Sequence, residues 1–428
     1  MRSQIVAAAL ILALVPPALP FEARAASGAL AHGGSYVIEP DATNATSAVG
    51  LWFRAPSAGY ANDTPGIGRV AATAAAAATL ESGVSLVSLV RSVGGTISID
   101  VYPDIIGVTV VVPASATRRV VAAMSAAYFT PSITEDALKT AQRDAAVLLA
   151  QRLYSSDDLL HDALFAQLFA GGPAHQSTLP TAVPELVTMS TDAVAKYARQ
   201  AFRSANATMT LAGHVDTTML DAVTAGAPGT ADSPFDSTLA SPAHDASIEG
   251  KAAGIGLAWA GPPIADERAA TALDFVSDYL FRDGSGVVSK GLDPTGDTYV
   301  SGQFITLHDP GVMLVTIGGS ALDDARTRVL AAVRALETPL DAASFAAARE
   351  AFLYHLASDT QTPLEQSENL GWYSVEGSAG YAPSDAQGQY WKIAQSLDPQ
   401  YVATVVKRYL DRPVVVRLTT APAKEPSS

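Results

Sequence analysis

The chain contains no cysteine and comparatively few charged side chains. Without a thiol it can form no disulfide, thiolate metal site, cysteine nucleophile or lipidated N-terminal cysteine. Charged residues make up only 16% of the 428 residues, and 42 Asp and Glu against 27 Lys and Arg leave a net charge of −15. That balance argues against a nucleic acid or an anionic membrane as the partner. Because 48% of the residues are hydrophobic, we expect two or three globular domains.

Hydrophobic runs long enough to span a membrane are also missing from the sequence. The N-terminal run from Ile5 to Val15 follows a basic residue, is too short to cross a bilayer and stops at Pro16. Ala23-Arg24-Ala25 provides a small-x-small cleavage site. We therefore expect residues 1–25 to be a signal peptide and the remaining chain to be periplasmic or secreted, without a membrane span. An uncleaved membrane anchor is the alternative.

Two segments about 200 residues apart share a pattern of small, apolar and aromatic residues. Residues 49–56 read VGLWFRAP, and residues 255–262 read IGLAWAGP. The expected elements that follow keep the same order, which indicates duplication of a whole domain. Expected strands at 108–112 and 312–317 each precede a helix, at 115–127 and 322–336, and each half closes with a helix and a strand, at 191–202 and 208–212 and at 400–410 and 414–418.

The segment between the halves has the composition of a linker. Residues 223–247 are rich in Gly, Pro, Ser, Asp and Ala and show no apolar periodicity. We expect an α+β fold of two homologous domains, each an antiparallel-rich sheet packed with helices. The expected boundaries are an N-terminal domain at 26–222, the linker at 223–247, a C-terminal domain at 248–421 and a tail at 422–428.

The order of several short motifs resembles that of the insulinase/pitrilysin family of zinc peptidases (inverzincins), which includes the mitochondrial processing peptidase. The motifs are Gly66-Ile67-Gly68 before a helix, Gly94-Gly95 before a strand, and Gly213 at the end of a strand. The resemblance covers nearly all of the chain after residue 25. It implies the duplicated α+β fold of that family.

The positions that match the family's zinc motif hold none of its functional residues. In the H-x-x-E-H motif two histidines bind zinc and the glutamate acts as general base. Here Arg69 and Thr73 stand at the histidine positions, and Ala72 stands at the glutamate position. Residues 148–150, where the third ligand would fall, read Leu-Leu-Ala. The resemblance therefore implies a member with no catalytic residues and no zinc in this chain.

Histidine spacing elsewhere does not indicate a metal site. None of the seven histidines stands three or four residues from another. His161 follows Asp157 and Asp158 by about one helical turn. We interpret this group as a solvated helix face.

The strand expected at residues 96–101 is a candidate for peptide binding. Thr96, Ile97, Ser98 and Ile99 alternate between polar and apolar side chains, as in a half-buried strand. In the family a peptide adds to the sheet beside the matching strand. The alternative is an edge that pairs within the fold or is covered by a partner.

A second pair of candidates lies in the C-terminal half. In two-chain members of the family, the subunit without zinc supplies an arginine and a tyrosine that hold the substrate backbone. Tyr299 matches that tyrosine, Leu292 stands at the arginine position, and Lys290 is a nearby cation without the bidentate geometry of arginine. An ordinary strand tyrosine is the alternative.

These features predict a catalytically inactive insulinase-type homologue. We expect it to be the non-zinc subunit of an exported heterodimeric peptidase, with a zinc-bearing family member as partner and peptide as substrate. The alternative is a stand-alone exported peptide-binding or scaffold protein. An active hydrolase with relocated chemistry is a third hypothesis, for which the sequence offers no motif.

Overall fold

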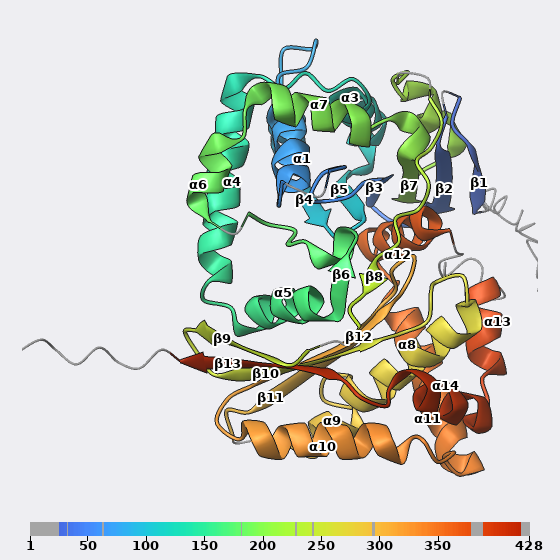
Figure 1. The fold of residues 1–428 in the computed structure, drawn as a ribbon. Helices are drawn as coiled ribbons and strands as arrows, with labels where there is room; N and C mark the ends of the chain where they lie inside the picture. Colours follow the sequence, from blue (N-terminus) through green and yellow to red (C-terminus); the bar gives the residue numbers. More distant parts are fainter. Residues whose placement is uncertain are drawn as a thin grey trace, which may run out of the picture.

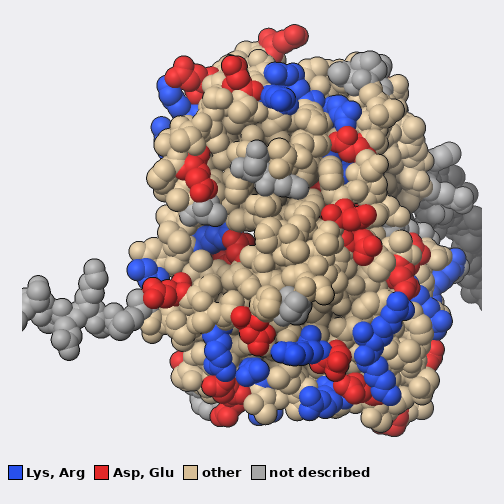
Figure 2. Space-filling view, viewed as in Figure 1, with Lys and Arg blue, Asp and Glu red and all other residues tan. Residues whose placement is uncertain are grey.

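The computed structural model describes residues 25–420, except for 32, 62–63, 181, 227–228, 242–243, 293–295 and 378–387. The expected signal peptide and tail therefore lie almost entirely outside the described residues. The described chain forms two stacked halves, each built on one sheet with helices around it (Figure 1). Basic side chains on the face seen in Figure 2 gather mainly over the second half.

The sheet of the first half has six strands in the order β1-β2-β7-β3-β5-β4. Only β2 and β7 run parallel, and the other neighbours are antiparallel. The central strand, at Thr46–Arg54, has buried residues on both faces of the sheet. This is expected of a strand that helices cover on each side. The strands span Ala26–Ala29 (β1), Ser35–Pro40 (β2), Thr46–Arg54 (β3), Thr96–Val101 (β4), Ile105–Pro113 (β5) and Ala207–Gly213 (β7).

The sheet of the second half has five strands in the order β11-β12-β10-β13-β9, with only β13 and β9 parallel. This order repeats that of β4-β5-β3-β7-β2. Gly50 lies opposite Thr109 and Thr210, and Gly256 lies at the equivalent point of its own sheet. The predicted α+β duplication is confirmed. The strands span Ala246–Gly250 (β9), Gly254–Ala260 (β10), Tyr299–Ile305 (β11), Val312–Gly318 (β12) and Val414–Thr420 (β13), and Phe169–Gly171 (β6) pairs separately with Thr238–Leu239 (β8).

An alanine-rich helix, α1, at Ile67–Ala77, packs against several other helices of the first half. Its small side chains are buried on several faces, which allows close packing against neighbouring helices. Gly66 before it has φ 75°, a left-handed conformation that favours glycine. The other helices are Leu86–Ser92 (α2), Thr117–Phe129 (α3), Glu135–Arg152 (α4), Ser156–Leu168 (α5), Val183–Thr188 (α6) and Thr191–Ala201 (α7).

Side chains cap the starts of several helices in the second half. Asp341 and Thr362 cap the starts of two of them, and Thr362 forms a capping box with Glu365. The helices span Glu267–Phe281 (α8), Val287–Lys290 (α9), Leu322–Ala335 (α10), Ala342–Ser358 (α11), Pro363–Glu376 (α12), Gln389–Ser396 (α13) and Pro399–Tyr409 (α14). No helix in the described part of the chain is both long enough and apolar enough to cross a bilayer.

Two equivalent helices are exchanged between the halves. Helix α12 packs on β3, β5 and β7 of the first sheet, and α5 packs on β10, β12 and β13 of the second (Figure 1). The hydroxyl groups of Thr210 on β7 and Ser367 on α12 are 2.7 Å apart. Gly50 and Gly256 each leave room for the incoming helix, since a Cβ at Gly256 would lie 2.7 Å from Leu164 on α5. Each inner sheet face is therefore covered by a helix from the other half.

Candidate functional site

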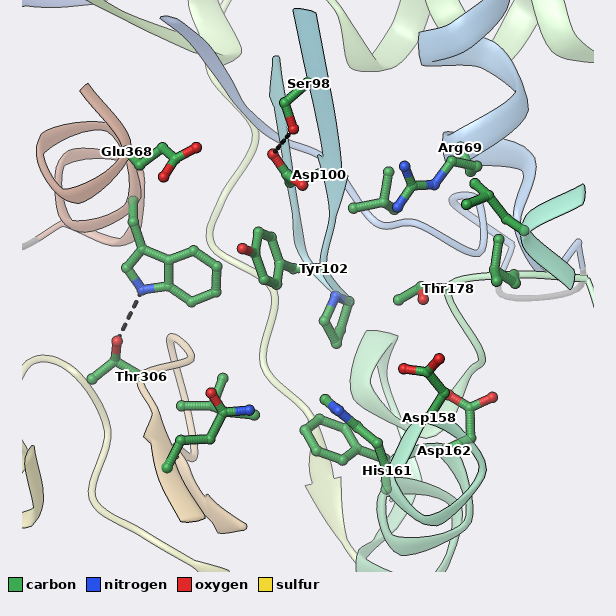
Figure 3. A pocket seen from close by; sticks show the side chains of 18 of the residues that line it. Arg69, Ser98, Asp100, Tyr102, Asp158, His161, Asp162, Thr178, Thr306 and Glu368 are labelled. Atoms are coloured by element: carbon green, nitrogen blue, oxygen red, sulfur yellow. Dashed lines mark hydrogen bonds between the residues drawn. The ribbon is translucent and has the colours of Figure 1, made fainter. Parts of the chain in front are cut away.

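A cavity of about 770 Å³ lies between the two halves. A space of this size is typical of a ligand site between domains. Seven elements contribute to its wall: α1, β3, β4, α4 and α5 from the first half, and β11 and α12 from the second (Figure 3). Its polar and charged lining includes Arg69, Ser98, Asp100, Gln151, Arg152, Asp158, His161, Asp162, Thr306 and Glu368.

Arg69, which we expect to match the first histidine of the zinc motif, extends from α1 toward β4 (Figure 3). Its Nη1 donates a hydrogen bond to the backbone carbonyl of Ile99. Burial lowers the pKa of Arg69, and the negative charge of Asp100 opposes that shift. A largely buried guanidinium is thus held at a position that we expect to match a metal ligand of the family.

The other motif positions offer no metal ligand. Ala72 is fully buried, and its carbonyl accepts a hydrogen bond from the Tyr128 hydroxyl at 3.0 Å. Thr73 follows on the same helix, and Leu148 on α4 lines the cavity together with Arg69. Zinc requires three or four nitrogen, oxygen or sulfur ligands, and a fixed cation beside it would oppose binding. These residues do not fit zinc, and no three His, Cys, Asp or Glu side chains anywhere in the described chain are grouped to hold a metal.

Strand β4 is the outermost strand of the first sheet and borders the cavity. The backbone N–H of Tyr102 donates to the Ile105 carbonyl at 2.9 Å, which closes the β4–β5 turn. Because antiparallel pairs alternate, the backbone groups of Ile97, Ile99 and Val101 then point away from β5. Ser98 faces the cavity, while the side chains of Ile97 and Ile99 pack on the core. Within the described residues no strand pairs with this edge, and Arg69 occupies the carbonyl of Ile99.

An acidic and aromatic wall joins β4 to α12. Asp100 accepts a hydrogen bond from the Ser98 hydroxyl at 2.7 Å, and Glu368 lies across from it (Figure 3). Burial raises the pKa of Glu368 to about 7, and the charges of Asp100 and Glu365 add to the rise. The rings of Tyr102 and Trp372 meet edge to face with centroids 4.3 Å apart. This wall combines residues from both halves.

Helix α5 forms the opposite wall, which corrects one expectation. His161 was expected on a solvated face, but it lines the cavity with Asp158 and Asp162 (Figure 3). Burial and the positive charge of Arg152 lower the pKa of His161 to about 4, so it is neutral at pH 7. Arg152 forms an ion pair with Asp162. The expectation was wrong because the exchange of α5 turns this face toward the other half.

Tyr299 and Lys290 do not belong to the cavity lining. Tyr299 begins β11, and its hydroxyl donates to Oδ1 of Asp157 at 3.1 Å. Burial and the charge of Asp157 raise the pKa of Tyr299 to about 12. Lys290 is exposed at the end of α9. The opposite end of β11, at residues 303–305, does line the cavity.

Several cavity residues were not identified from the sequence. Glu368 and Trp372 lie on α12, whose part in the site depends on its crossing to the other sheet. Neither belongs to a motif, so no local signal could have marked them. Thr306 accepts a hydrogen bond from the indole N–H of Trp372 at 2.9 Å, so its part in the site also depends on the crossing of α12.

Comparison with known proteins relates the chain to others through its structure. No family model and no curated protein matches the sequence. A protease from Helicobacter pylori matches with a TM-score of 0.80 at 14% identity, over 93% of this chain and 99% of that one. A peptidase M16 inactive domain from Pseudomonas fluorescens matches with a TM-score of 0.76 at 13% identity, over 94% and 100%. Complex III2 from Candida albicans contains a chain that matches with a TM-score of 0.74 at 14% identity, over 92% and 95%. The chain therefore has the two-half fold of the M16, or insulinase/pitrilysin, peptidases.

Proposed function

We propose that this chain is a catalytically inactive M16-type protein, exported, that serves as the non-zinc subunit of a heterodimeric peptidase and helps to enclose and orient peptide. The observation that carries the proposal is Arg69. A bound guanidinium replaces a zinc ligand, and Ala72 replaces the general base. Without either group, the chain has no means in this site to activate water for peptide hydrolysis.

The open edge of β4 supports peptide binding. An extended peptide that pairs with β4 would meet the outward backbone groups of Ile97 and Val101, with its alternate side chains directed into the cavity. Ser98 and Asp100 lie on the cavity side of the same strand. Main-chain pairing holds peptides of varied sequence, which suits a subunit that orients substrate.

A partner with zinc would supply the missing chemistry. A zinc-bearing subunit of the same fold is the partner class that we propose, because this chain has a cavity and a strand edge, and its described residues include no group that could hold a metal. The inactive M16 domain among the structural neighbours supports the view that this fold occurs without activity. The sequence of residues 1–25 supports export to the periplasm or beyond.

The test begins with the tagged chain from residue 26, recovered from its native extract. We expect an H-x-x-E-H protein of similar length to copurify in near-equal amount. The isolated chain should contain no stoichiometric zinc and should leave a quenched peptide library uncleaved. Stoichiometric zinc together with cleavage that a chelator abolishes would refute the proposal.

A stand-alone peptide-binding protein is the second candidate, and the cavity within a single chain favours it. The two candidates differ in one result. Recovery of the chain alone, with peptide affinity intact, would support the stand-alone binder. Peptide affinity is measured by fluorescence anisotropy with a labelled extended peptide. As a control, a proline in that peptide at a position that pairs with β4 should weaken binding, because proline lacks the N–H donor.

A further inference from the structure

Two carboxyl groups from opposite halves meet in a buried junction next to the cavity. Asp104 lies in the β4–β5 turn, and Glu376 is the last residue of α12. Both side chains are almost fully buried, and the two carboxyl groups are hydrogen-bonded to each other. They are separated by more than half of the chain and meet only because α12 crosses to the first sheet.

The charged groups around this pair come from three further segments. Arg54, at the end of β3, donates to the carbonyls of Val375 at 2.7 Å and Asp232 at 2.9 Å. The backbone N–H of His308 donates to the Asp104 carboxyl, while its ring contacts Asp236 at 2.7 Å. The positive charge of Arg54 favours ionisation of Glu376, and that of His308 favours ionisation of Asp104. One guanidinium and one imidazole, which is charged only when protonated, therefore face two carboxyl groups.

The pair needs a proton in order to remain closed. Burial raises the pKa of both carboxyl groups, and the charge of Asp104 raises that of Glu376 further. Oδ1 of Asp104 and Oε1 of Glu376 are buried and accept no hydrogen bond from any described group. Two carboxylates in contact with so few donors cannot both ionise without strong repulsion. A single shared proton removes that repulsion and is the donor of the hydrogen bond between the two carboxyl groups.

The junction is directly connected to the cavity wall. Tyr102 is two residues before Asp104, and Trp372 is one helical turn before Glu376. Their rings form the contact that closes this side of the cavity. Trp372 and Val375 also pack with Trp52 and Ile105 in a small apolar cluster. Separation of the two carboxyl groups would therefore move Trp372 away from Tyr102.

We propose that Asp104 and Glu376 form a proton-dependent latch between the two halves. With one shared proton, the latch holds the last turn of α12 on the β4–β5 turn. Loss of that proton drives the two groups apart and opens the aromatic wall of the cavity. The latch is a property of this chain alone and needs neither peptide nor partner, so it can be tested even if the proposed function is wrong.

The test follows tryptophan fluorescence of the chain from residue 26 between pH 5 and pH 11. Burial and the charge of Asp104 raise the pKa of Glu376 to about 10, so we expect a reversible change in the emission maximum as pH approaches that value, carried by Trp372 and absent in Trp372→Phe. Glu376→Gln and Asp104→Asn should each remove the change, because one neutral partner ends the repulsion. Either variant alone suffices if the other does not fold. A flat profile in the unmodified chain, or an unchanged profile in a folded variant, would overturn the latch.

Two control variants test whether the effect belongs to this pair. Glu368→Gln changes another acid on α12, and Asp274→Asn changes a buried acid of α8 that accepts a hydrogen bond from Tyr390 at 2.8 Å. Both should retain the fluorescence change. Loss of the change in either control, with retention in Glu376→Gln, would assign it to a different group and overturn the latch.

Urea unfolding provides an independent readout. The folded pair holds a proton at pH values where the unfolded chain has released it, so the unfolding equilibrium constant should rise with pH by up to about tenfold per pH unit for each extra proton held. Glu376→Gln should flatten this rise above pH 6. An equally steep rise in the variant would contradict the proposal.

Discussion

The two halves share one sheet topology but use their equivalent edge strands differently. In the first half, Arg69 of α1 donates to Ile99 on β4; in the second, Ser277 of α8 donates to Gly302 on β11 at 3.4 Å. The first contact places a buried positive charge at the cavity edge, and the second contact is neutral. A duplicated scaffold thus keeps a helix-to-edge contact while its chemistry diverges. Of these two helix-to-edge contacts, the one in the first half carries a charge.

The largest expected effect is the return of zinc binding to the first half. The triple variant Arg69→His, Ala72→Glu, Thr73→His restores two ligands and the base but not the third ligand, so we expect weak binding. Addition of Leu148→Glu, on the cavity side of α4, should tighten zinc affinity by roughly 100-fold, since a tetrahedral site needs at least three protein ligands. Isothermal titration with zinc measures the difference. Tight binding by the triple variant would show that the distal ligand position has been misplaced.

A second test compares the two glycines where the exchanged helices enter. A Cβ at Gly50 would lie 2.2 Å from the Thr210 hydroxyl and 2.7 Å from that of Ser367, both buried. A Cβ at Gly256 would lie 2.7 Å from the flexible end of Leu164 and 3.4 Å from Cβ of Leu160, the second an ordinary contact distance. We expect Gly50→Ala to lower the free energy of unfolding by about 3 kcal/mol and Gly256→Ala by about 1 kcal/mol. Urea denaturation measures the free energy of unfolding of both variants. Equal losses would contradict the expectation that the surroundings of Gly50 yield less than those of Gly256.

The stabilising effects of the two helix-to-edge contacts should differ by a smaller amount. Arg69→Met leaves the Ile99 carbonyl without its charged donor, and we expect a loss of about 2 kcal/mol in the free energy of unfolding. Ser277→Ala removes a long, neutral hydrogen bond and should cost less than about 0.5 kcal/mol. Thermal and urea unfolding of the two variants provide the comparison. If both variants lose the same free energy of unfolding, the charge of Arg69 does not strengthen its contact with β4.

The smallest expected effect concerns the carboxyl groups that face each other across the cavity. Glu368 in the folded chain has its pKa raised to about 7 from a usual 4.5. The folded state therefore binds more protons than the unfolded state between these values, and stability should fall as pH rises through that window. Solvent screening at this half-buried group should keep the change below about 1 kcal/mol.

Asp100→Asn gives the matched comparison for Glu368. Its negative charge is one cause of the raised pKa, so its removal should lower the pKa of Glu368. An NMR titration of the Glu368 carboxyl carbon measures the shift. An unchanged pKa would leave burial and Glu365 as the causes.

Much of the fold was predictable because local patterns specify it. The similar segments that contain Gly50 and Gly256 indicated the duplication, and the alternation in residues 96–101 indicated the strand that lies at the edge. A helix was expected directly after the Gly66-Ile67-Gly68 motif, and α1 lies there. These patterns involve only residues that are close together in the sequence, so they can be recognised without knowledge of the tertiary fold.

The composition of the site was less predictable. His161 has the spacing of a solvated helix face, and nothing near it in the sequence shows that α5 covers the other sheet. Glu368 and Trp372 carry no motif, yet they form one wall of the cavity. The positions of these side chains depend on packing between residues that are far apart in the chain.

The sequence by itself determined the duplicated α+β plan, because residue types and their periodicity are sufficient for it. The replacement of the zinc ligands and the base stays a prediction from the family resemblance. Only the tertiary structure decided what occupies the space between the halves. Arg69 meets Ile99, and Asp104 meets Glu376, through the exchange of α5 and α12. That exchange is stabilised by complementary packing at Gly50 and Gly256, and such complementarity exists only once both sheets have formed.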